Sequence, residues 1–189
     1  MYKRQAVLPD IAQAIDNKLA QEGISKSDVE GVGIGVPGPV RSDGVVNGCV
    51  NLGWGVINVA EELGAQTGLK VKVGNDANVA GLGEMWQGGG KGSKDVIMVT
   101  LGTGVGGGII VDGHVVAGYN GAGGEIGHIT VNHDEIEPCN CGQYGCLEQY
   151  TSATGIVRMA KRKLAKTQDA TKLRDYKDIT AKDIFDVAK

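Results

Sequence analysis

The sequence predicts an α/β fold with two domains. Amphipathic helical patterns alternate along the chain with short runs of β-branched residues, an order typical of sheets covered by helices. Glycine supplies 32 of the 189 residues, and 17 of these lie between Gly81 and Gly127, with apolar segments between the clusters. The glycines are therefore expected in tight loops of a folded protein. The glycine run at 88–92 predicts the boundary between an N-terminal domain, residues 1–92, and a C-terminal domain, residues 93–189.

The N-terminal domain is expected to consist of helices and strands in alternation. Residues 1–5 show no periodicity and are left out of the fold prediction. Gly23 and Gly68 follow two of the helical patterns, and Asn58 is a suitable N-cap residue. The first strand alternates Val and Ile with Gly, so one of its faces is nearly bare. The predicted elements are a helix at 8–22, a strand at 31–40, a helix at 59–66, a strand at 71–73 and a helix at 76–86.

The C-terminal domain is expected to begin with a β-meander and to end in helices. Asp112 and Gly113 form a dipeptide typical of a tight hairpin turn. The predicted elements are strands at 95–101, 109–111 and 114–117, a tight turn at 102–108, and helices at 152–166 and 181–188.

Charge and hydropathy exclude several classes of protein. Residues 156–189 hold 10 of the 19 Lys and Arg but only 5 of the 22 acids. These charges lie on an amphipathic helical pattern without interleaved aromatic residues, so we do not expect nucleic acid as a partner. No apolar run reaches the length of a membrane helix, and the N-terminus lacks the pattern of a secretory signal. We therefore expect no membrane contact and a cytoplasmic location.

A glycine-rich turn between two β-branched strands is a candidate anion site. Backbone N–H groups of such a turn can converge on a phosphate, and the Thr103 hydroxyl adds a donor. A plain hairpin turn is the alternative. The segment is not a Walker A loop, because no Lys-Ser/Thr follows, and a strand follows where the dinucleotide fingerprint requires a helix. The glycines concerned are Gly102, Gly104, Gly106, Gly107 and Gly108.

A second candidate is Asp76, which lies in the segment 73–78 where a strand runs into a helix. One interpretation is an N-cap, for which Asn and Asp are preferred. The other is a carboxylate at the mouth of a cleft that accepts a proton from a substrate hydroxyl. The local pattern does not separate the two.

The cysteines predict a zinc site. Cys139, Cys141 and Cys146 follow His128 closely, and three thiolates with one imidazole form a tetrahedral zinc site. A disulfide is the alternative, but it would leave one of the three cysteines unpaired, and no secretory signal is present. Cys49, in a valine-rich context, is expected to be a small buried hydrophobic residue.

Two carboxylates adjoin this predicted site. Glu125 and Glu148 each lie within three residues of a predicted zinc ligand, so the folded metal site would bring both acids toward one place. Carboxylates beside a rigid, glycine-lined hollow suit a polyol, whose adjacent hydroxyls are paired donors. Solvated acids near a metal loop are the alternative.

Together these motifs resemble the ROK family of repressors, open reading frames and sugar kinases, and among its members the bacterial glucokinases. The resemblance covers nearly the whole chain after residue 5. It implies an actin-like ATPase, hexokinase-type (ribonuclease H-like) fold, in which two α/β domains flank a cleft with sugar on one wall and ATP on the other. The motifs that carry it, in chain order, are Gly74-Asn-Asp-Ala-Asn78, Leu101-Gly-Thr-Gly-Val-Gly-Gly-Gly108, Gly123-Gly-Glu-Ile-Gly-His128 and Cys139-Asn-Cys-Gly-Gln-Tyr-Gly-Cys-Leu-Glu148.

The resemblance also implies roles for individual residues. Asp76 would be the general base that deprotonates the sugar 6-hydroxyl in ATP-dependent phosphorylation of glucose, the first step of glycolysis. The other sugar hydroxyls would be held by Asn75, Glu125, His128 and Glu148. Thr103 and the glycines between 102 and 108 would line the phosphates of ATP, which is used with Mg²⁺. Zinc on His128 and the three cysteines would be structural, and the complete protein would be a homodimer or tetramer.

The sequence departs from the family pattern at both ends. An N-terminal Asp-x-Gly-Gly-Thr turn for phosphate and Mg²⁺, and a C-terminal Gly-Gly turn for adenosine, are absent from these residues. We therefore expect a chain cut at both ends, with poor or no turnover by itself. Alternative functions are a sugar-responsive transcriptional repressor of the same family and a kinase for fructose, mannose, N-acetylglucosamine or N-acetylmannosamine.

Overall fold

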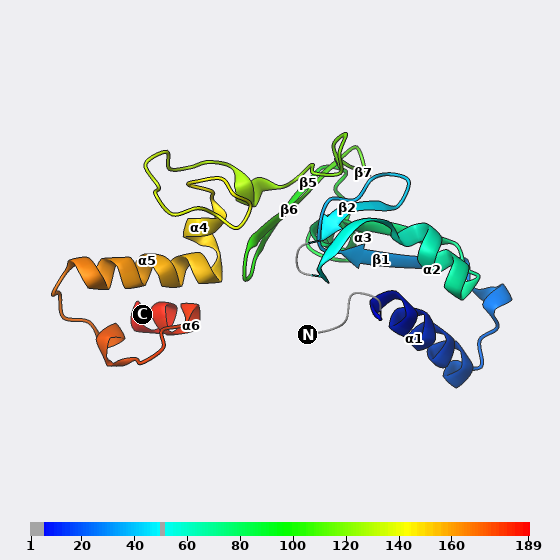
Figure 1. Cartoon of the computed structure of the whole chain (residues 1–189), viewed down its shortest axis with the longest axis horizontal. Coiled ribbons are helices and arrows are strands. Elements are labelled where there is room, and N and C mark those ends of the chain that lie inside the picture. Colours follow the sequence, from blue (N-terminus) through cyan, green and yellow to red (C-terminus); the bar gives the residue numbers. More distant parts are fainter. Residues whose placement is uncertain (1–5, 50–51) are drawn as a thin grey trace. The chain divides into compact units, whose positions relative to one another are not determined.

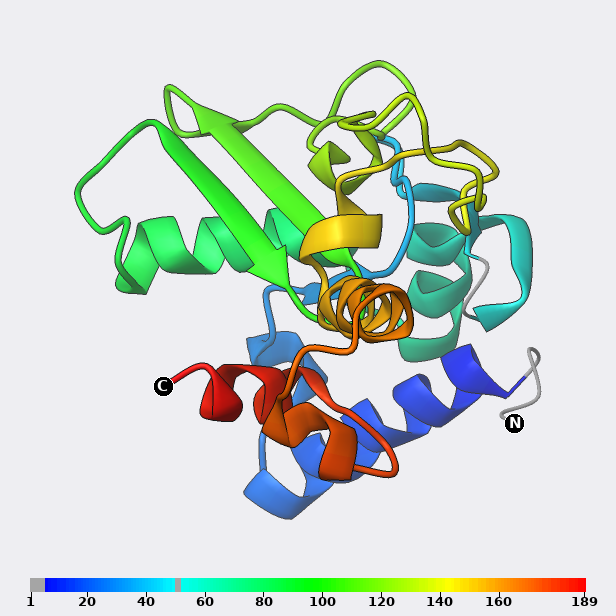
Figure 2. The ribbon, with the colours of Figure 1, turned by 90° about the vertical axis from the view of Figure 1, so that its left-hand side faces the viewer.

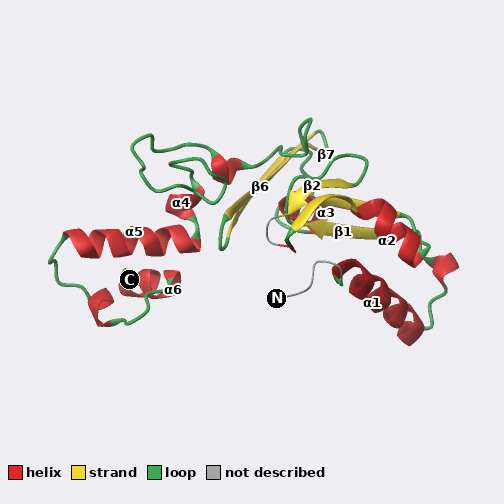
Figure 3. Cartoon of the chain, viewed as in Figure 1, coloured by secondary structure: helices red, strands yellow, loops and turns green. Residues whose placement is uncertain are grey.

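The structure, a computed structural model, describes residues 6–49 and 52–189 (Figure 1). The chain forms two compact units, which are described separately. Unit 1 comprises Met1–Met98 and Gly108–Gly124, and unit 2 comprises Val99–Gly107 and Glu125–Lys189. Helices and strands are mixed, as predicted (Figure 3). The assignment of 1–92 and 93–189 to separate domains stays a prediction.

Unit 1 is built around two short sheets. In the first sheet β1 and β4 are parallel, with Val32 opposite Val71 and Val36 opposite Asn75. In the second, β2 and β3 are antiparallel. The elements are α1 (Val7–Glu22), β1 (Val32–Val36), β2 (Val45–Cys49), β3 (Trp54–Asn58), α2 (Val59–Thr67), β4 (Val71–Asn75) and α3 (Asp76–Gln87), with a 3₁₀ turn η1 (Lys26–Asp28) after α1.

The helix ends of unit 1 confirm the capping predictions. Gly23 ends α1 with φ of 66°, and Gly68 ends α2 with φ of 71°, both in the left-handed region that favours glycine. The Asn58 side chain accepts a hydrogen bond from the Glu61 N–H at 3.1 Å and so begins α2. The hairpin β2–β3 is absent from the sequence prediction, because Asn47 and Gly48 interrupt its apolar pattern.

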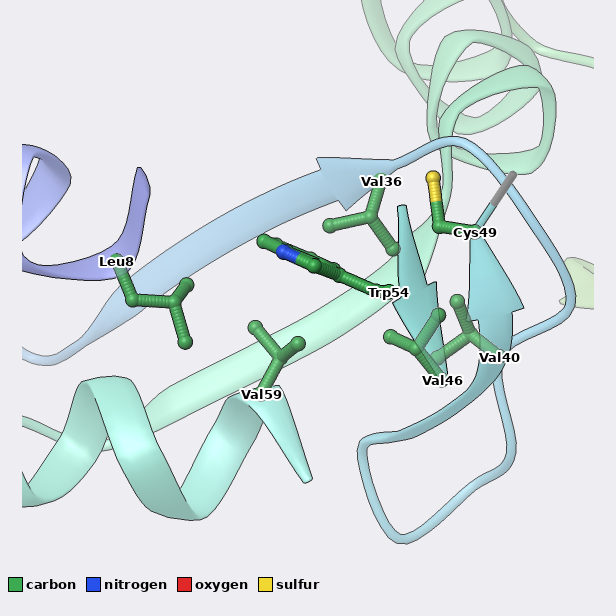
Figure 4. Packing of buried hydrophobic residues seen from close by; sticks show 7 residues of the cluster. All are labelled: Leu8, Val36, Val40, Val46, Cys49, Trp54 and Val59. Atoms are coloured by element: carbon green, nitrogen blue, oxygen red, sulfur yellow. The ribbon is translucent and has the colours of Figure 1, made fainter. Parts of the chain in front are cut away.

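The hydrophobic core of unit 1 joins α1 and α2 to both sheets (Figure 4). Trp54 lies among aliphatic side chains contributed by several elements, and Val46 and Val59 are fully buried. Each such side chain contributes roughly 1.5–3 kcal/mol when it is removed from water. Cys49, 3% exposed, is a buried small residue as predicted. The cluster comprises Leu8, Val36, Val40, Val46, Cys49, Trp54 and Val59.

A three-stranded sheet of order β5-β6-β7 follows α3, and its long hairpin contributes residues to both units. The strands are β5 (Val96–Leu101), β6 (Val105–Val111) and β7 (His114–Val115). Asp112 and Gly113 have φ of 50° and 77°, which confirms the predicted tight turn. The predicted turn at 102–108 was too long, because β6 begins at Val105 and includes the glycines at 106–108.

Helix α3 lies along the unit 1 portion of this hairpin (Figure 2). A Cβ on Gly81 would lie 3.6 Å from Met98 and 3.7 Å from Ile110. A Cβ on Gly108 would lie only 2.8 Å from the Ala77 carbonyl oxygen. Close packing of helix on strand therefore accounts for glycine at 108, independently of any ligand.

Besides its part of the β5–β6 hairpin, unit 2 consists of an irregular segment followed by helices. Ser152 caps α5 by accepting from the Gly155 N–H, and Thr180 forms a capping box with Asp183 at α6. The long helix thus begins and ends within one residue of its prediction. Among the described residues, no helix is both long enough and apolar enough to cross a membrane. The elements are η3 (Ile126–His128), α4 (Glu148–Thr151), α5 (Ala153–Lys166), η4 (Lys172–Asp175) and α6 (Ala181–Val187).

Candidate functional site

Asn75 fixes the junction between β4 and α3 in unit 1. Its side-chain oxygen accepts from the Asn78 N–H at 3.1 Å and caps α3, and its amide nitrogen donates to the Gly38 carbonyl at 3.2 Å. Asn75 is buried, with 9% exposure. One side chain therefore holds the end of a strand, the start of a helix and the loop after β1.

Asp76 is the first residue of α3, and its side chain is exposed. Its Oδ1 accepts from the neighbouring Ala77 N–H at 2.9 Å. Since Asn75 already caps the helix, the capping interpretation of Asp76 is not needed to explain how α3 begins. The carboxylate is left at the surface of unit 1, where a ligand hydroxyl can reach it.

The glycine turn of unit 2 is limited to residues 102–104. The Gly102 N–H donates to the Gly104 carbonyl at 3.0 Å, and the turn is attached to the start of α5. There the Ala153 N–H donates to Gly102 O at 2.9 Å and the Thr154 hydroxyl donates to Thr103 O at 2.8 Å. Among the described residues, the N–H groups of Thr103 and Gly104 have no acceptor. These two groups are the donors that the turn can offer to an anion.

Glu148 connects this turn to the cysteine segment. Its Oε2 accepts from the Val105 N–H at 3.1 Å, and its Oε1 accepts from the Cys139 thiol at 3.5 Å. A Cβ on Gly104 would lie 2.3 Å from Glu148 Oε2, so glycine at 104 lets the carboxylate approach. Glu148, the first residue of α4, is therefore fixed by contacts to both segments. These contacts connect the glycine motif at 101–108 with the cysteine motif at 139–148.

His128, Cys139, Cys141 and Cys146 form one cluster in unit 2. Their possible ligand atoms all lie within 4.8 Å of one another. Cys141 Sγ lies 3.6 Å from Cys146 Sγ, and His128 Nδ1 lies 3.9 Å from Cys139 Sγ. All three thiols are free, so the disulfide alternative is not realised. Three thiols and an imidazole at these separations are a donor set suited to tetrahedral zinc.

The two buried thiols of this cluster are poor acids without a cation. Burial raises the pKa of the Cys139 thiol. Burial, aided by the neighbouring thiols, raises the pKa of Cys146 to about 12. Metal binding requires the thiolate form, and a bound cation would supply the positive charge that this pocket lacks. The types and separations of the four donors fit a divalent metal, whose binding would displace the thiol protons.

Glycines shape the backbone around the cluster. A Cβ on Gly127 would lie 2.2 Å from the Val105 carbonyl, so η3 packs directly on β6 and brings His128 with it. Gly145 has φ of 70°, and a Cβ there would lie 1.7 Å from the Asn132 carbonyl. The isolated bridges Thr130↔Cys146 and Pro138↔Tyr144 close residues 130–146 into a compact loop, the cysteine knuckle.

One buried charged residue near the cluster was absent from the sequence prediction. The side chain of Glu135 is 2% exposed and accepts hydrogen bonds from Nη1 and Nη2 of Arg162, at 2.8 Å each. The Arg162 guanidinium holds the pKa of Glu135 well below its usual range. Arg162 lies 27 residues further along the chain, on α5, so no local sequence pattern predicts the Glu135–Arg162 ion pair.

The structure thus brings together some of the predicted residues and keeps others in separate units. In unit 2, Glu148 and the predicted metal ligands are in contact, and Glu125 immediately precedes η3, which ends at His128. Asn75 and Asp76 belong to unit 1. Of the predicted phosphate glycines, Gly106, Gly107 and Gly108 are strand residues, whereas Gly102 and Gly104 are in the turn. Whether each residue contacts sugar or ATP stays a prediction.

Comparison with known proteins identifies the relatives of the chain. The model of the ROK family matches residues 3–189. A glucokinase of Halalkalibacterium halodurans is 46% identical over 186 residues, which are 96% of this chain and 56% of that protein. The chain therefore spans a little over half the length of this relative.

Two solved structures are similar in fold. A ROK family transcriptional regulator, described as a homologue of the E. coli MLC protein, superposes with a TM-score of 0.83 at 27% identity and covers 98% of this chain and 46% of that one. A ROK family glucokinase of Streptomyces griseus, solved in complex with glucose and AMPPNP, has a TM-score of 0.67 at 41% identity and covers 84% of this chain and 51% of that one.

These likenesses confirm the expected fold class, the mixed α/β actin-like ATPase fold of ROK hexokinases and glucokinases. The family match covers nearly every residue, and the relative at 46% identity covers 96% of the sequence. The chain belongs to the ROK family.

Proposed function

We propose that the protein carrying this chain is a glucokinase, which transfers the γ-phosphoryl group of ATP to the 6-hydroxyl of glucose. The observation that carries the proposal is 46% identity to a glucokinase over 96% of the chain. The exposed Asp76 carboxylate, freed from capping by Asn75, supports it. This activity would be the first step of glycolysis, and its use of ATP would place the protein in the cytoplasm.

We propose sugar-binding roles for five residues of the chain. In the proposal Asp76 accepts the proton of the 6-hydroxyl, and Asn75 contacts the sugar beside it. Glu125, His128 and Glu148 bind the remaining hydroxyls. In phosphoryl transfer, positioning and charge stabilisation supply most of the rate, and the base mainly orients the hydroxyl. The hydrogen bonds that fix Asn75 and Glu148 support such a positioning role.

ATP as the phosphoryl donor is supported by the complex of the S. griseus relative with AMPPNP. It would be bound with Mg²⁺, as phosphoryl transfer from ATP generally requires. We propose that Thr103 and Gly104 donate their N–H groups to the phosphates, because these donors have no acceptor among the described residues. Gly102 would permit the turn that presents them. Mg²⁺ would neutralise the charge of the phosphates when bound.

Zinc would be held by His128, Cys139, Cys141 and Cys146, in agreement with the chemistry of this donor set. Its role would be structural: it would join η3 to the cysteine knuckle and fix the ring of His128, so that the second ring nitrogen faces the sugar. The complete protein would be a homodimer or tetramer.

A sugar-responsive repressor is the second candidate, favoured by the TM-score of 0.83 with a ROK transcriptional regulator. Kinases for other hexoses differ from a glucokinase in the groups around the sugar C2 position. Both alternatives keep a sugar site, so sugar binding alone does not separate them from the main proposal.

The test is a coupled assay of ATP-dependent sugar phosphorylation by the full-length protein, with glucose, fructose, mannose, N-acetylglucosamine and N-acetylmannosamine. Glucose is expected to give the highest kcat/KM. Preference for another sugar would reassign the substrate, and sugar binding without any turnover would favour the repressor. The 189 residues alone are expected to show poor or no turnover, and elemental analysis should find about one zinc ion per chain.

A further inference from the structure

The carboxylate of Glu135 is the centre of a buried cluster in unit 2. Its Oε2 accepts from the Tyr150 hydroxyl at 2.7 Å, from Arg162 at 2.8 Å and from Arg158 at 3.2 Å. Its Oε1 accepts from Arg162 at 2.8 Å and from the N–H groups of Ile136 and Glu137 at 3.0 Å each. Both oxygens are therefore saturated with donors, and the side chain is 2% exposed.

The arginines of this cluster are one turn apart on α5. Residues at this spacing share one face of a helix, so Arg158 and Arg162 both contact the segment 135–137. Arg158 also lies over the Tyr150 ring, with its guanidinium carbon 5.6 Å from the centroid. Both arginines pair in addition with Glu137, whose side chain is 54% exposed. The cluster thus has a buried acid, Glu135, and a peripheral one, Glu137.

A buried ion pair is weak support for stability by itself, because desolvation offsets much of the attraction. Breaking such a pair is costly, however, because it leaves charge buried without a partner. A cluster of this kind therefore imposes one geometry on the segments that it joins. The segments joined here are α5 and the backbone at 135–137.

That backbone leads directly to the predicted metal ligands. Glu137 and Pro138 precede Cys139 in the chain. The Gln149 side chain continues the connection, since its amide nitrogen donates to the Glu137 carbonyl and its oxygen accepts from the Cys146 N–H, each at 3.0 Å. Arg158 donates to the Gln149 carbonyl at 3.0 Å. Two of the ligand positions are therefore tied to α5 through the same cluster.

We propose that Glu135 is a positioning residue for the metal site: it fixes the segment before Cys139 against α5, so that the four ligands are close together before the metal binds. The inference rests on the proposed metal site and extends beyond the ligands themselves. Residues that orient metal ligands from outside the coordination sphere typically change metal affinity by 10–100-fold.

The test compares Glu135→Gln with Glu137→Gln in the 189-residue chain. Both substitutions remove one carboxylate charge from a glutamate that contacts the same arginines. Co²⁺ and Zn²⁺ affinities are measured by competition with a chromogenic chelator, and the absorption bands of bound Co²⁺ report its coordination. We expect Glu135→Gln to weaken metal binding by roughly 10–100-fold. We expect Glu137→Gln to change it by less than about two-fold, because that side chain is 54% exposed and its ion pairs are screened by water.

Equal affinities of wild type and Glu135→Gln, or equal losses in both variants, would overturn the positioning role. A wild-type chain that binds no metal would refute the metal site itself, which is a different result. If Glu135→Gln does not fold, Arg162→Gln removes the two-pronged contact while Arg158 remains, and exposed Lys161→Gln in the same helix is its control. A folded Arg162→Gln with the metal affinity of Lys161→Gln would also overturn the proposal.

Discussion

Asn75 and Asp76 are adjacent at the start of α3, but their side chains have different surroundings. Asn75 is buried and uses its amide to cap the helix and to hold the loop at Gly38. Asp76 is exposed, and its Oδ1 bonds only to the next N–H in the chain. The sequence alone could not assign the cap to one of the two. The hydrogen bond from the Asn78 N–H assigns the cap to Asn75. The carboxylate of Asp76 is therefore not needed as the helix cap.

The first prediction concerns this carboxylate. Asp76→Asn should lower the turnover of the full-length protein by about 100-fold or more, because general-base catalysis typically contributes 10²–10⁴-fold. Glucose affinity, measured by calorimetry, should change only a few-fold, since the amide has nearly the same size. Asp10→Asn is the matched control, because Asp10 is also an exposed aspartate in the first turn of a helix of unit 1. A variant that retains more than about a tenth of the activity would exclude Asp76 as the base.

A second prediction separates backbone strain from steric overlap in the cysteine knuckle. Gly142 and Gly145 have φ of 87° and 70°, but a Cβ would meet no atom within 4 Å at 142 and would lie 1.7 Å from the Asn132 carbonyl at 145. Gly142→Ala should cost about 1–2 kcal/mol of unfolding free energy from strain. Gly145→Ala should cost about 1–3 kcal/mol more, because the backbone must move. Urea unfolding followed by circular dichroism measures both, and equal losses would contradict the overlap.

At the scale of elements, α5 contacts both the glycine turn at 102–104 and the segment that leads to the cysteines. Its N-terminal residues Ala153 and Thr154 hold the carbonyls of the glycine turn, and its middle holds Glu135. The sequence predicted this helix well, because its period and its Ser152 cap are local signals. Its partners could not be predicted, since the pairing of Glu135 with Arg162 joins residues far apart in the chain.

The predicted metal ligands and strand β6 differ in the same way: the first could be predicted from local sequence, and the second depends on contacts between distant residues. The predicted metal ligands lie in one short segment, residues 128–146, so the spacing of the residues is enough to predict a metal site. In contrast, the glycines at 106–108 are typical of a turn, yet they belong to β6. Packing decides this case: the first turn of α3 lies against Gly108, and a strand with side chains at that position would not fit. Tertiary contacts therefore outweigh the weak strand propensity of glycine.

A third prediction follows from the lowered pKa of Glu135. In the folded chain this carboxyl binds a proton less readily than in the unfolded chain, where its pKa is about 4.3. Its stabilisation is therefore complete above that value and is lost as the pH falls below it. The unfolding free energy of the wild type should fall more steeply between pH 5 and about 3 than that of Glu135→Gln. Urea titrations with chelator present, so that metal release does not contribute, should show this difference, and parallel slopes would contradict it.

The whole molecule combines two units with different interiors. Unit 1 has an apolar core of Leu8, Trp54 and several valines. In the described part of unit 2, Val105 is the one buried aliphatic side chain, and the other buried side chains are thiol, amide, hydroxyl or carboxylate groups. In this chain, a metal bound among these polar side chains would add directly to the stability of unit 2. The proposed zinc would therefore contribute to the folding of unit 2 far more than to that of unit 1.

The last prediction tests this difference with the two tryptophans of the chain, both of which lie in unit 1. Trp54 is buried in the core, whereas Trp86 on α3 is 72% exposed, so Trp86→Phe leaves Trp54 as the only tryptophan reporter. Circular dichroism reports the helices of both units, whereas Trp54 fluorescence reports unit 1 alone. Chelation of the metal should therefore lower the urea midpoint of the part of the dichroism change that Trp54 fluorescence does not follow, because structural zinc contributes directly to folding energy. The midpoint of Trp54 fluorescence should stay unchanged.

Two cysteine variants serve as controls. Cys146→Ser should have the same effect as the chelator, without any chelator present. Cys49→Ser, in the core of unit 1, should shift the midpoint of Trp54 fluorescence instead. A Trp54 transition that moves together with the dichroism on chelation would show that the metal stabilises both units as one.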